Sequence, residues 1–297
     1  MESKKSIAVI GLGLMGTPIA TRLMKAGYVV TGYDIVEEQI KKLTHLGLVP
    51  ATSPSDAAGK AEIVILSLPN WNIVREAVEG NVGILTNSKR GQIVLDMSTS
   101  PPVESRAMAQ KLEKCGIEWM DAPISGSSAQ AKVGNMVFMV GGKKDTYEIV
   151  KPILDSIGKK TVYVGKNGDG AMLKLVVNHT LMLNQAAAIE GMVLGLKAGL
   201  DPDIMYDVLT SGAASSDLII ARGKDMLSGD FSPKGQLMIG VKDLALSLDA
   251  GKQYSVVLPV GALYHQFIMM AHYNKLDEYD ATVVMKLYEE WAGLKRQ

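Results

Sequence analysis

The chain has 297 residues, about twice a typical domain, which predicts two domains that each bury a core. Its 31 lysines and arginines balance 31 aspartates and glutamates, so no basic field is present and we expect no nucleic-acid partner. The single cysteine, Cys115, excludes an intrachain disulfide and suits a reducing compartment, which favours a cytoplasmic protein.

No long apolar stretch runs without charged or polar residues for the ~20 positions needed to cross a bilayer. The apolar run at residues 7–10 is interrupted at once by Gly11 and Gly13, unlike the apolar region of a secretory signal. We therefore expect a soluble protein that is neither exported nor bound to a membrane.

The first half alternates apolar, β-branched runs with amphipathic stretches, which is typical of a parallel, doubly wound sheet. The expected strands are residues 6–10, 28–34, 62–68, 92–97, 117–121, 136–140 and 161–164. The expected helices are residues 15–26, 36–46, 72–78, 102–115 and 143–156. This pattern predicts an α/β domain over residues 1–165.

The pattern changes after Gly170, because residues 171–198 read as one uninterrupted helix and only helical segments follow. Those segments are residues 202–210, 216–226, 237–250, 259–271 and 281–292. We predict an all-α domain over residues 166–297, joined to the first domain by the long helix.

A glycine-rich segment, Gly11-Leu12-Gly13-Leu14-Met15-Gly16, lies between the first predicted strand and the first predicted helix. Gly11 permits a tight turn, Gly13 lets the backbone approach a pyrophosphate, and Gly16 lets helix and strand pack closely. This context predicts that all six residues form a dinucleotide-binding turn.

Asp34 follows the next predicted strand, 21 residues beyond Gly13. A carboxylate in this place accepts hydrogen bonds from the adenosine ribose hydroxyls and repels a 2′-phosphate. Ile35 and Val36 follow, without an arginine to pair with that phosphate. The sequence therefore predicts NAD in preference to NADP.

Two further segments carry candidate substrate residues. Ser125, Gly126 and Ser127 follow a predicted strand end and offer N–H groups and hydroxyls to an anion, although such turns also occur as plain loops. Lys174 and Asn178 are four residues apart on the long helix and therefore share a face. A lysine partly removed from water can act as general acid or base, and the alternative is a lysine that extends into solvent.

Five motifs occur in an order that resembles the β-hydroxyacid dehydrogenase family. They are the glycine turn, DMST at residues 96–99, DAPISG at 121–126, GDGAMLKLVVN at 168–178 and KDLAL at 242–246. The family includes 3-hydroxyisobutyrate dehydrogenase, tartronate semialdehyde reductase, and the glyoxylate and succinic semialdehyde reductases. The resemblance implies a Rossmann domain, a long interdomain helix, a helical C-terminal domain and a homodimer or homotetramer.

The resemblance also implies roles for individual residues. Lys174 matches the catalytic lysine, Asn178 the residue that orients the substrate oxygen, and the turn at residues 125–127 the substrate-carboxylate site. The matching cofactor contacts are Thr99, Lys242 and the loop at Leu68 and Pro69, with Asp243 holding Lys242, and Phe231 matches an aromatic residue that borders the substrate.

Two positions depart from the family pattern, because Ser127 and Gln130 stand where members of the hydroxyisobutyrate type carry glycine. Ser127 is more similar to the glyoxylate and succinic semialdehyde reductases, whereas residues 134–142 resemble the hydroxyisobutyrate type. The extra hydroxyl at Ser127 either binds a polar group of the substrate or narrows the carboxylate pocket.

We therefore predict an NAD-dependent oxidoreductase that interconverts a small 3-hydroxy acid and its semialdehyde, with Lys174 as general acid and base. The alternatives are a glyoxylate or succinic semialdehyde reductase acting reductively, and a dinucleotide-binding regulatory protein without turnover. The four histidines show no metal-ligand spacing, so no metal is expected, and Met182, Met192, Met269 and Met270 are expected to fill the core.

Overall fold

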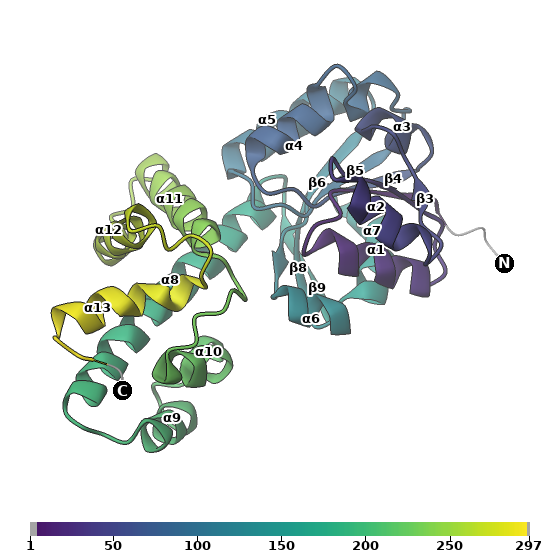
Figure 1. Cartoon of the computed structure of the whole chain (residues 1–297). Coiled ribbons are helices and arrows are strands. Elements are labelled where there is room, and N and C mark those ends of the chain that lie inside the picture. The colour runs from purple at the N-terminus through teal and green to yellow at the C-terminus, as the bar shows by residue number, and fades with distance from the viewer. Residues whose placement is uncertain (1–4, 296–297) are drawn as a thin grey trace. The chain divides into compact units, whose positions relative to one another are not determined.

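A computed structural model describes residues 5–295, which divide into two compact units that meet within a helix, between Lys174 and Leu175 (Figure 1). The first unit is an α/β Rossmann-type domain and the second is all helical. Both classes agree with the expectation from the sequence.

The described residues of the first unit contain a nine-stranded sheet with the order β3-β2-β1-β4-β5-β6-β8-β7, and β9 pairs with β8. The pairs from β3 to β6 are all parallel. The strands are β1 (Ile7–Ile10), β2 (Val30–Tyr33), β3 (Val49–Pro50), β4 (Ile63–Leu66), β5 (Ile93–Asp96), β6 (Glu118–Asp121), β7 (Ile124–Ser125), β8 (Val137–Gly141) and β9 (Lys160–Gly165).

One strand direction differs from the predicted parallel sheet. The strand expected at residues 136–140 joins the sheet as β8, but it runs antiparallel to both β6 and β7. Parallel neighbours need a crossover of a dozen or more residues, whereas β8 follows β7 after a short connection that holds only one six-residue helix. The strand expected at residues 161–164, β9, pairs parallel with β8.

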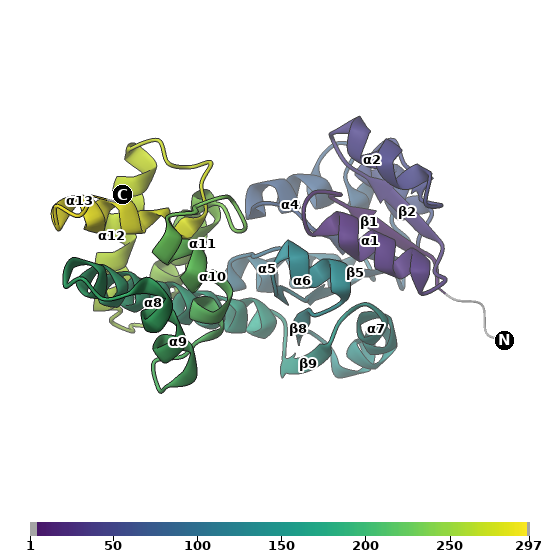
Figure 2. The ribbon, with the colours of Figure 1, turned by 60° about the horizontal axis from the view of Figure 1, so that its bottom comes forward.

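Helices cover both faces of the sheet because side chains alternate along each strand. Ile7 and Val9 face a core shared with α1 and α7, while Ala8 and Ile10 face a core shared with α3, α4 and α5. Figure 2 shows α1 lying along β1 and β2, with which it packs. The helices of this unit are α1 (Gly16–Lys25), α2 (Glu37–Thr44), α3 (Pro54–Gly59), α4 (Trp71–Glu79), α5 (Pro102–Lys114), α6 (Ser128–Val133) and α7 (Lys144–Ile157), with a 3-10 turn, η1 (Ile84–Thr86).

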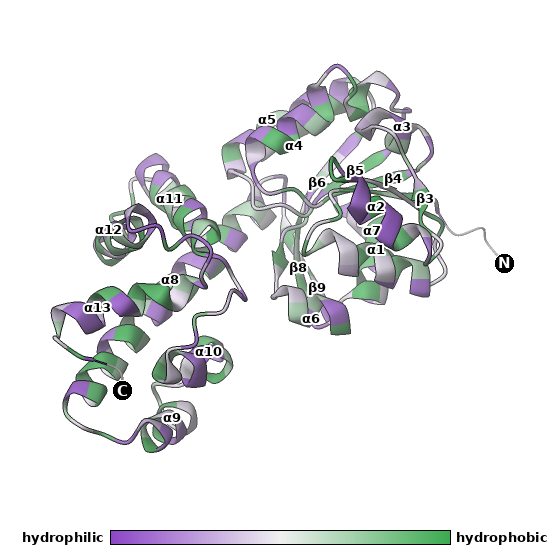
Figure 3. Cartoon of the chain, viewed as in Figure 1, coloured by the Kyte–Doolittle hydropathy of each residue, from purple (hydrophilic) through white to green (hydrophobic). Residues whose placement is uncertain are grey.

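The longest helix, α8 (Asp169–Lys197), starts in the first unit and continues through the second. The other elements of the second unit are α9 (Pro202–Ser211), α10 (Asp217–Ser228), α11 (Leu237–Gln253), α12 (Pro259–Tyr273), η2 (Ala281–Val284) and α13 (Met285–Trp291). Figure 3 shows that these helices carry hydrophobic and hydrophilic residues together. Their buried apolar side chains form one core. No helix within residues 5–295 is both long and apolar enough to cross a membrane.

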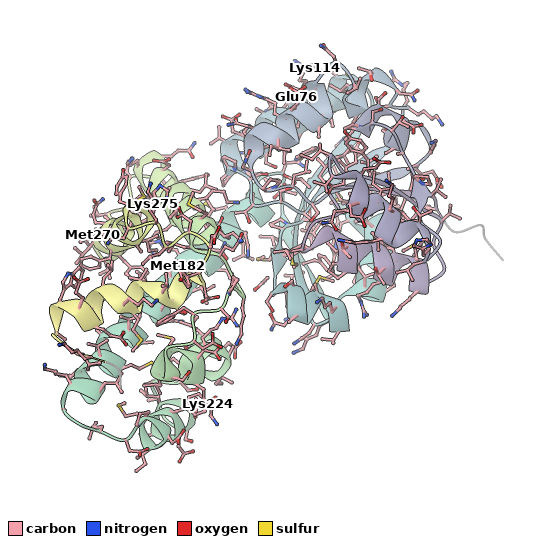
Figure 4. The ribbon with its side chains drawn as sticks, in the orientation of Figure 1. Glu76, Lys114, Met182, Lys224, Met270 and Lys275 are labelled. Carbon is pink, nitrogen blue, oxygen red and sulfur yellow. The ribbon has the colours of Figure 1, made fainter. Side chains whose placement is uncertain are left out.

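The methionines do not all fill the core as predicted. Met182 and Met192 on α8 are buried in the second unit, whereas Met270 on α12 is 41% exposed. Figure 4 labels Met182 and Met270. The prediction for Met270 was therefore wrong. It neighbours Met269 on a helix that buries only one face, and α12 turns Ile268 and Ala271 inward instead.

Candidate functional site

The glycine turn has the close packing that a dinucleotide requires. A Cβ at Gly11 would lie 2.3 Å from the Ser67 carbonyl oxygen, and Gly11 itself has φ of +92°. A Cβ at Gly16 would lie 1.8 Å from the Gly11 carbonyl oxygen, so only glycine lets α1 start this close to β1. Gly13 is exposed, and no atom lies within 4 Å of the position that a Cβ would occupy there, which leaves its backbone open to a ligand.

Asp34 lies beside this turn, directly after β2. Its Oδ2 accepts a hydrogen bond from the Leu12 N–H at 2.6 Å and its Oδ1 accepts one from the Val36 N–H at 2.8 Å. Each carboxylate oxygen has a second lone pair, so the group can still accept from ribose hydroxyls. The residues present therefore fit a dinucleotide, with the open backbone at Gly13 for the pyrophosphate and Asp34 for the ribose.

The two loops expected beside the cofactor are joined by hydrogen bonds. Ser98, next to Thr99, accepts a hydrogen bond at its Oγ from the Leu68 N–H at 3.0 Å. The Ser98 N–H in turn donates to Asp96 Oδ1 at 2.9 Å, and the Ser100 hydroxyl donates to Asp96 Oδ2 at 2.6 Å. Asp96 thus organises the loop after β5 directly and the Leu68–Pro69 loop through Ser98.

The turn at residues 125–127 has an unpredicted feature. Ser127 is the N-cap of α6, and its Oγ accepts from the Gln130 N–H at 3.3 Å. In return the Ser127 N–H donates to Gln130 Oε1 at 2.7 Å. The two residues that depart from the family pattern therefore bind each other in a capping box. The next residue back, Gly126, has φ of +146°, a conformation that favours glycine.

Lys174 is the last residue of the first unit and lies half-buried on the second turn of α8. Asn178 lies one turn further along, with its side chain 5% exposed. The spacing of four residues places the two side chains on the same side of the helix, as the sequence predicts.

Within the second unit, Asn178, Asp243 and Lys242 form a connected group. The Asn178 Nδ2 donates to Asp243 Oδ2 at 2.6 Å, and both side chains are buried. The Lys242 ammonium lies 3.3 Å from Asp243 Oδ1. Asp243 thus holds Lys242 as expected, and it also fixes the Asn178 amide.

Phe231 is 4% exposed and belongs to the core of the second unit. It also lines a hollow of about 660 Å³, together with Ser232, Gln236 and Lys286. The Lys286 ammonium lies 5.4 Å from the centre of the Phe231 ring and 4.8 Å from that of Tyr279. The aromatic side chain therefore borders a space with a cation at its wall.

Two buried aspartates were missed as functional candidates. Asp96 and Asp121 end the neighbouring strands β5 and β6 and stand opposite each other in the register of the sheet. Burial raises the pKa of both carboxyl groups to about 6, despite their hydrogen bonds. Asp96 and Asp121 are the first residues of the DMST and DAPISG motifs, and each directly ends a predicted strand. That position could have marked both aspartates as functional candidates.

These side chains share one edge of the first unit. The glycine turn, Asp34, the Leu68–Pro69 loop and Thr99 follow β1, β2, β4 and β5, which are mutually parallel. Ser125 ends β7, the short strand that comes three residues after β6. Open α/β sheets bind ligands outside the carboxyl ends of their strands. The first unit therefore presents its predicted residues where a ligand of this fold binds.

The chain matches two family models. Residues 6–165 match the NAD binding domain of 6-phosphogluconate dehydrogenase, and residues 168–288 match the NAD-binding domain of NADP-dependent 3-hydroxyisobutyrate dehydrogenase. Among characterised relatives, 2-(hydroxymethyl)glutarate dehydrogenase of Eubacterium barkeri is 34% identical, covering 99% of this chain and 98% of the relative. The 2-hydroxy-3-oxopropionate reductase of Escherichia coli is 31% identical, covering 97% and 99%.

Solved structures give the same result. A 3-hydroxyisobutyrate dehydrogenase from Salmonella typhimurium superposes with a TM-score of 0.88 at 27% identity, over 96% of this chain and all of that chain. Psf3, in complex with NADP⁺ and 2-OPP, has a TM-score of 0.88 at 26% identity, over 95% and 99%. The chain belongs to the β-hydroxyacid dehydrogenase family and is a 3-hydroxyisobutyrate dehydrogenase-like, NAD(P)-binding oxidoreductase that acts on 3-hydroxy acids.

Proposed function

We propose that the protein is an NAD-dependent enzyme that interconverts a small 3-hydroxy acid and its semialdehyde, with Lys174 as general acid and base. The observation that carries the proposal lies within the first unit. The helix that bears Lys174 begins at the same sheet edge as the glycine turn, Asp34 and Thr99. We assign residues 1–165 to cofactor binding and residues 166–297 to the helical domain.

Lys174 moves the proton in this proposal. When bound, the nicotinamide supplies the acceptor for the hydride that leaves the alcohol carbon. The neutral Lys174 amine accepts the hydroxyl proton during oxidation, and the ammonium returns it during reduction. Asn178, on the same side of α8, orients the substrate oxygen, and Asp243 holds the Asn178 amide in place.

The substrate carboxylate binds at the turn of residues 125–127 in this proposal, and Phe231 borders the rest of the substrate. The Ser127 N–H is engaged with Gln130 Oε1, so Ser125 and Gly126 supply the backbone contacts, while the Ser127 hydroxyl accepts from the Gln130 N–H and keeps its own proton to donate. The capping box also gives Ser127 a local role. A glyoxylate or succinic semialdehyde reductase, which the resemblance at Ser127 favours, is the second candidate function.

The proposed preference for NAD over NADP rests on Asp34. Its carboxylate follows β2 and is fixed by the Leu12 and Val36 N–H groups, where it would repel a 2′-phosphate. Thr99 and Lys242 complete the proposed cofactor contacts, with the Leu68–Pro69 loop beside them. Psf3, a relative in the same family, is solved with NADP⁺, so the preference of this chain is measured with both cofactors side by side.

A homodimer or homotetramer in the cytoplasm completes the proposal. Val260, Leu263 and Met270 share one side of α12 and are 58%, 58% and 41% exposed, an apolar face suited to a second copy. The single cysteine supports the reducing compartment. Size-exclusion chromatography with light scattering tests the assembly, and a monomer at micromolar concentration would contradict it.

The experiment that tests the function is a substrate panel. Short 3-hydroxy acids are incubated with NAD⁺ or NADP⁺ at alkaline pH, and the matching semialdehydes with NADH or NADPH near neutral pH. We expect turnover with 3-hydroxy acids and NAD⁺. Turnover confined to glyoxylate or succinic semialdehyde, or dependent on NADP(H), would overturn the corresponding part of the proposal.

A further inference from the structure

Asp121 connects the end of β6 to the beginning of α8. Its carboxylate is 1% exposed, and its Oδ1 accepts a hydrogen bond from the Gly168 N–H at 2.7 Å. Its Oδ2 accepts one from the Ala171 N–H at 2.8 Å. Ala171 lies in the first turn of α8, where an N–H has no carbonyl partner within the helix, and Gly168 directly precedes that turn. Asp121 therefore binds the start of the helix from another element.

The first turn of α8 is also fixed by close packing. A Cβ at Gly170 would lie 2.4 Å from the Met139 carbonyl oxygen and 2.9 Å from Asp121 Oδ2. A Cβ at Gly141 would lie 2.7 Å from the same carboxylate oxygen. The Asn167 side chain adds a bond, since its Nδ2 donates to the Trp119 carbonyl oxygen at 2.6 Å. The turn therefore rests on β6 and β8 with no room for a side chain between them.

Lys174 follows Ala171 by three residues, which is less than one turn of helix. An α-helix is stiff over this length, so a shift of its first turn moves Lys174 by a comparable distance. We propose that Asp121 is a positioning residue that fixes the first turn of α8, and with it Lys174, against the ligand-binding edge of the sheet. This inference rests on the proposed role of Lys174.

Asp96 provides an internal comparison. It ends the neighbouring strand and is buried to the same degree, but its carboxylate binds Ser98 and Ser100. Through Ser98 it supports the Leu68 N–H, so its partners lie in the two proposed cofactor loops. The two aspartates therefore support different segments at this edge of the sheet. Asp96 fixes the two proposed cofactor loops, and Asp121 fixes the start of the helix that bears Lys174.

The same geometry predicts a pH effect. Burial raises the pKa of Asp121 to about 6. Asp169 on α8 and Asp96 on β5 add negative charge around it, and the β8 residue packed against it is the uncharged Gly141. A proton on Asp121 removes an acceptor from one of the two N–H groups. Reductive turnover should therefore fall as the pH drops through about 6. Acid does not oppose the proposed role of the Lys174 ammonium as proton donor, so this fall would point to Asp121.

The test compares Asp121→Asn with Asp96→Asn in the full chain. Asn is nearly isosteric but places an NH₂ group against one of the N–H donors. For Asp121→Asn we expect kcat to fall about 100-fold, with the KM for NAD changed less than twofold and the acidic limb of the reductive pH profile lost. For Asp96→Asn we expect the KM for NAD to rise about tenfold, with the smaller effect on kcat.

Two further measurements test the proposal if Asp121→Asn folds poorly. Gly170→Ala leaves Asp121 intact but displaces the first turn of α8 from β8. It should also lower kcat without raising the KM for NAD. Amide hydrogen exchange over residues 168–174 should accelerate in Asp121→Asn and not in Asp96→Asn.

The proposal is overturned if Asp121→Asn keeps its kcat while Lys174→Ala loses it, or if both aspartate variants change kcat and KM alike. A Lys174→Ala variant that kept its turnover would overturn the proposed function itself, whereas the exchange measurement would still decide whether Asp121 holds the turn.

Discussion

Gln130 Oε1 accepts a hydrogen bond from the Ser127 N–H at 2.7 Å, directly at the turn proposed to bind the substrate carboxylate. Oε1 also lies 3.6 Å from the position that a Cβ would occupy at Gly126. The Gln130 amide therefore lies over the turn and occupies a donor that a carboxylate could otherwise use. A glutamine at this position stabilises α6 and, if the proposed carboxylate site is correct, competes with the substrate for the Ser127 N–H.

Substitution of Gln130 should change substrate affinity in either direction. Gln130→Gly releases the Ser127 N–H, and a hydrogen bond to a charged group contributes about 1.5–3 kcal/mol, so the KM for the 3-hydroxy acid should fall about tenfold. Loss of the capping box should cost about 1 kcal/mol of stability. Gln130→Glu keeps an acceptor for the Ser127 N–H but adds a negative charge, and should raise KM about tenfold.

Steady-state kinetics and thermal unfolding check both Gln130 variants. The matched control is Lys132→Ala, which changes an exposed position of α6 outside the capping box. Equal KM values in all of these proteins would show that the substrate does not bind at this turn.

Cofactor selectivity should depend on Asp34. Repulsion of a 2′-phosphate by a fixed carboxylate predicts a kcat/KM for NAD about 100-fold above that for NADP. In a double variant, Asp34→Ser with Ile35→Arg, we expect this ratio to fall below one. Asp34 also binds the Leu12 N–H, so both cofactors should lose some affinity, and the ratio is the informative quantity. Near-equal use of NAD and NADP by the unchanged enzyme would contradict this role.

Asn178→Ala should destabilise the helical unit as well as impair turnover. The substitution removes the 2.6 Å bond to Asp243 Oδ2 and leaves a buried carboxylate with one donor fewer, at a cost of about 1–3 kcal/mol. Urea unfolding measures the loss. Thr180→Ala is the control, because its exposed hydroxyl donates to the Val176 carbonyl oxygen in the same helix. A free energy of unfolding that drops no further than in the control would disprove the structural role.

The stability of the first unit should carry a signature of Asp96. Its folded pKa, about 6, lies above the ordinary value of 3.8, so the folded state holds a proton that the unfolded state has lost between these values. This group alone therefore increases the free energy of unfolding as the pH falls from about 6 to about 4, by about 1.4 kcal/mol per pH unit.

Urea unfolding of wild type and Asp96→Asn at several pH values tests this sign. Between pH 6.5 and pH 3.5, the free energy of unfolding of wild type should rise by about 3 kcal/mol relative to that of Asp96→Asn. A difference that stays constant, or moves the other way, would mean that Asp96 titrates near its ordinary value.

Much of the fold could be predicted from local pattern. Strands and helices of the first half follow from alternating apolar runs, and the glycine turn and Asp34 from their spacing. The direction of β8 could not be predicted, because apolar periodicity is the same in parallel and antiparallel strands. The short helices α3 and α6 hold six residues each, too few for a periodic signal.

Among the other features of the site, the capping box could have been predicted from the sequence, whereas the bonds of Asp121 depend on tertiary contacts. Ser127 and Gln130 match the S-x-x-Q pattern of a capping box, so their mutual bonds could have been predicted. The bonds from Asp121 to Gly168 and Ala171 could not, because they depend on a segment 47 and 50 residues away returning to the end of β6. Long-range returns of this kind leave no local pattern.

The most direct test of the proposed mechanism is the turnover of Lys174→Ala beside its affinity for NADH. Fluorescence titration measures NADH binding, and reduction of NAD⁺ by the best 3-hydroxy acid measures kcat. We predict that kcat falls about 1,000-fold, as expected for loss of a general base, while the dissociation constant for NADH changes less than twofold. A variant that binds NADH normally and retains more than a tenth of the wild-type kcat would contradict the role of Lys174.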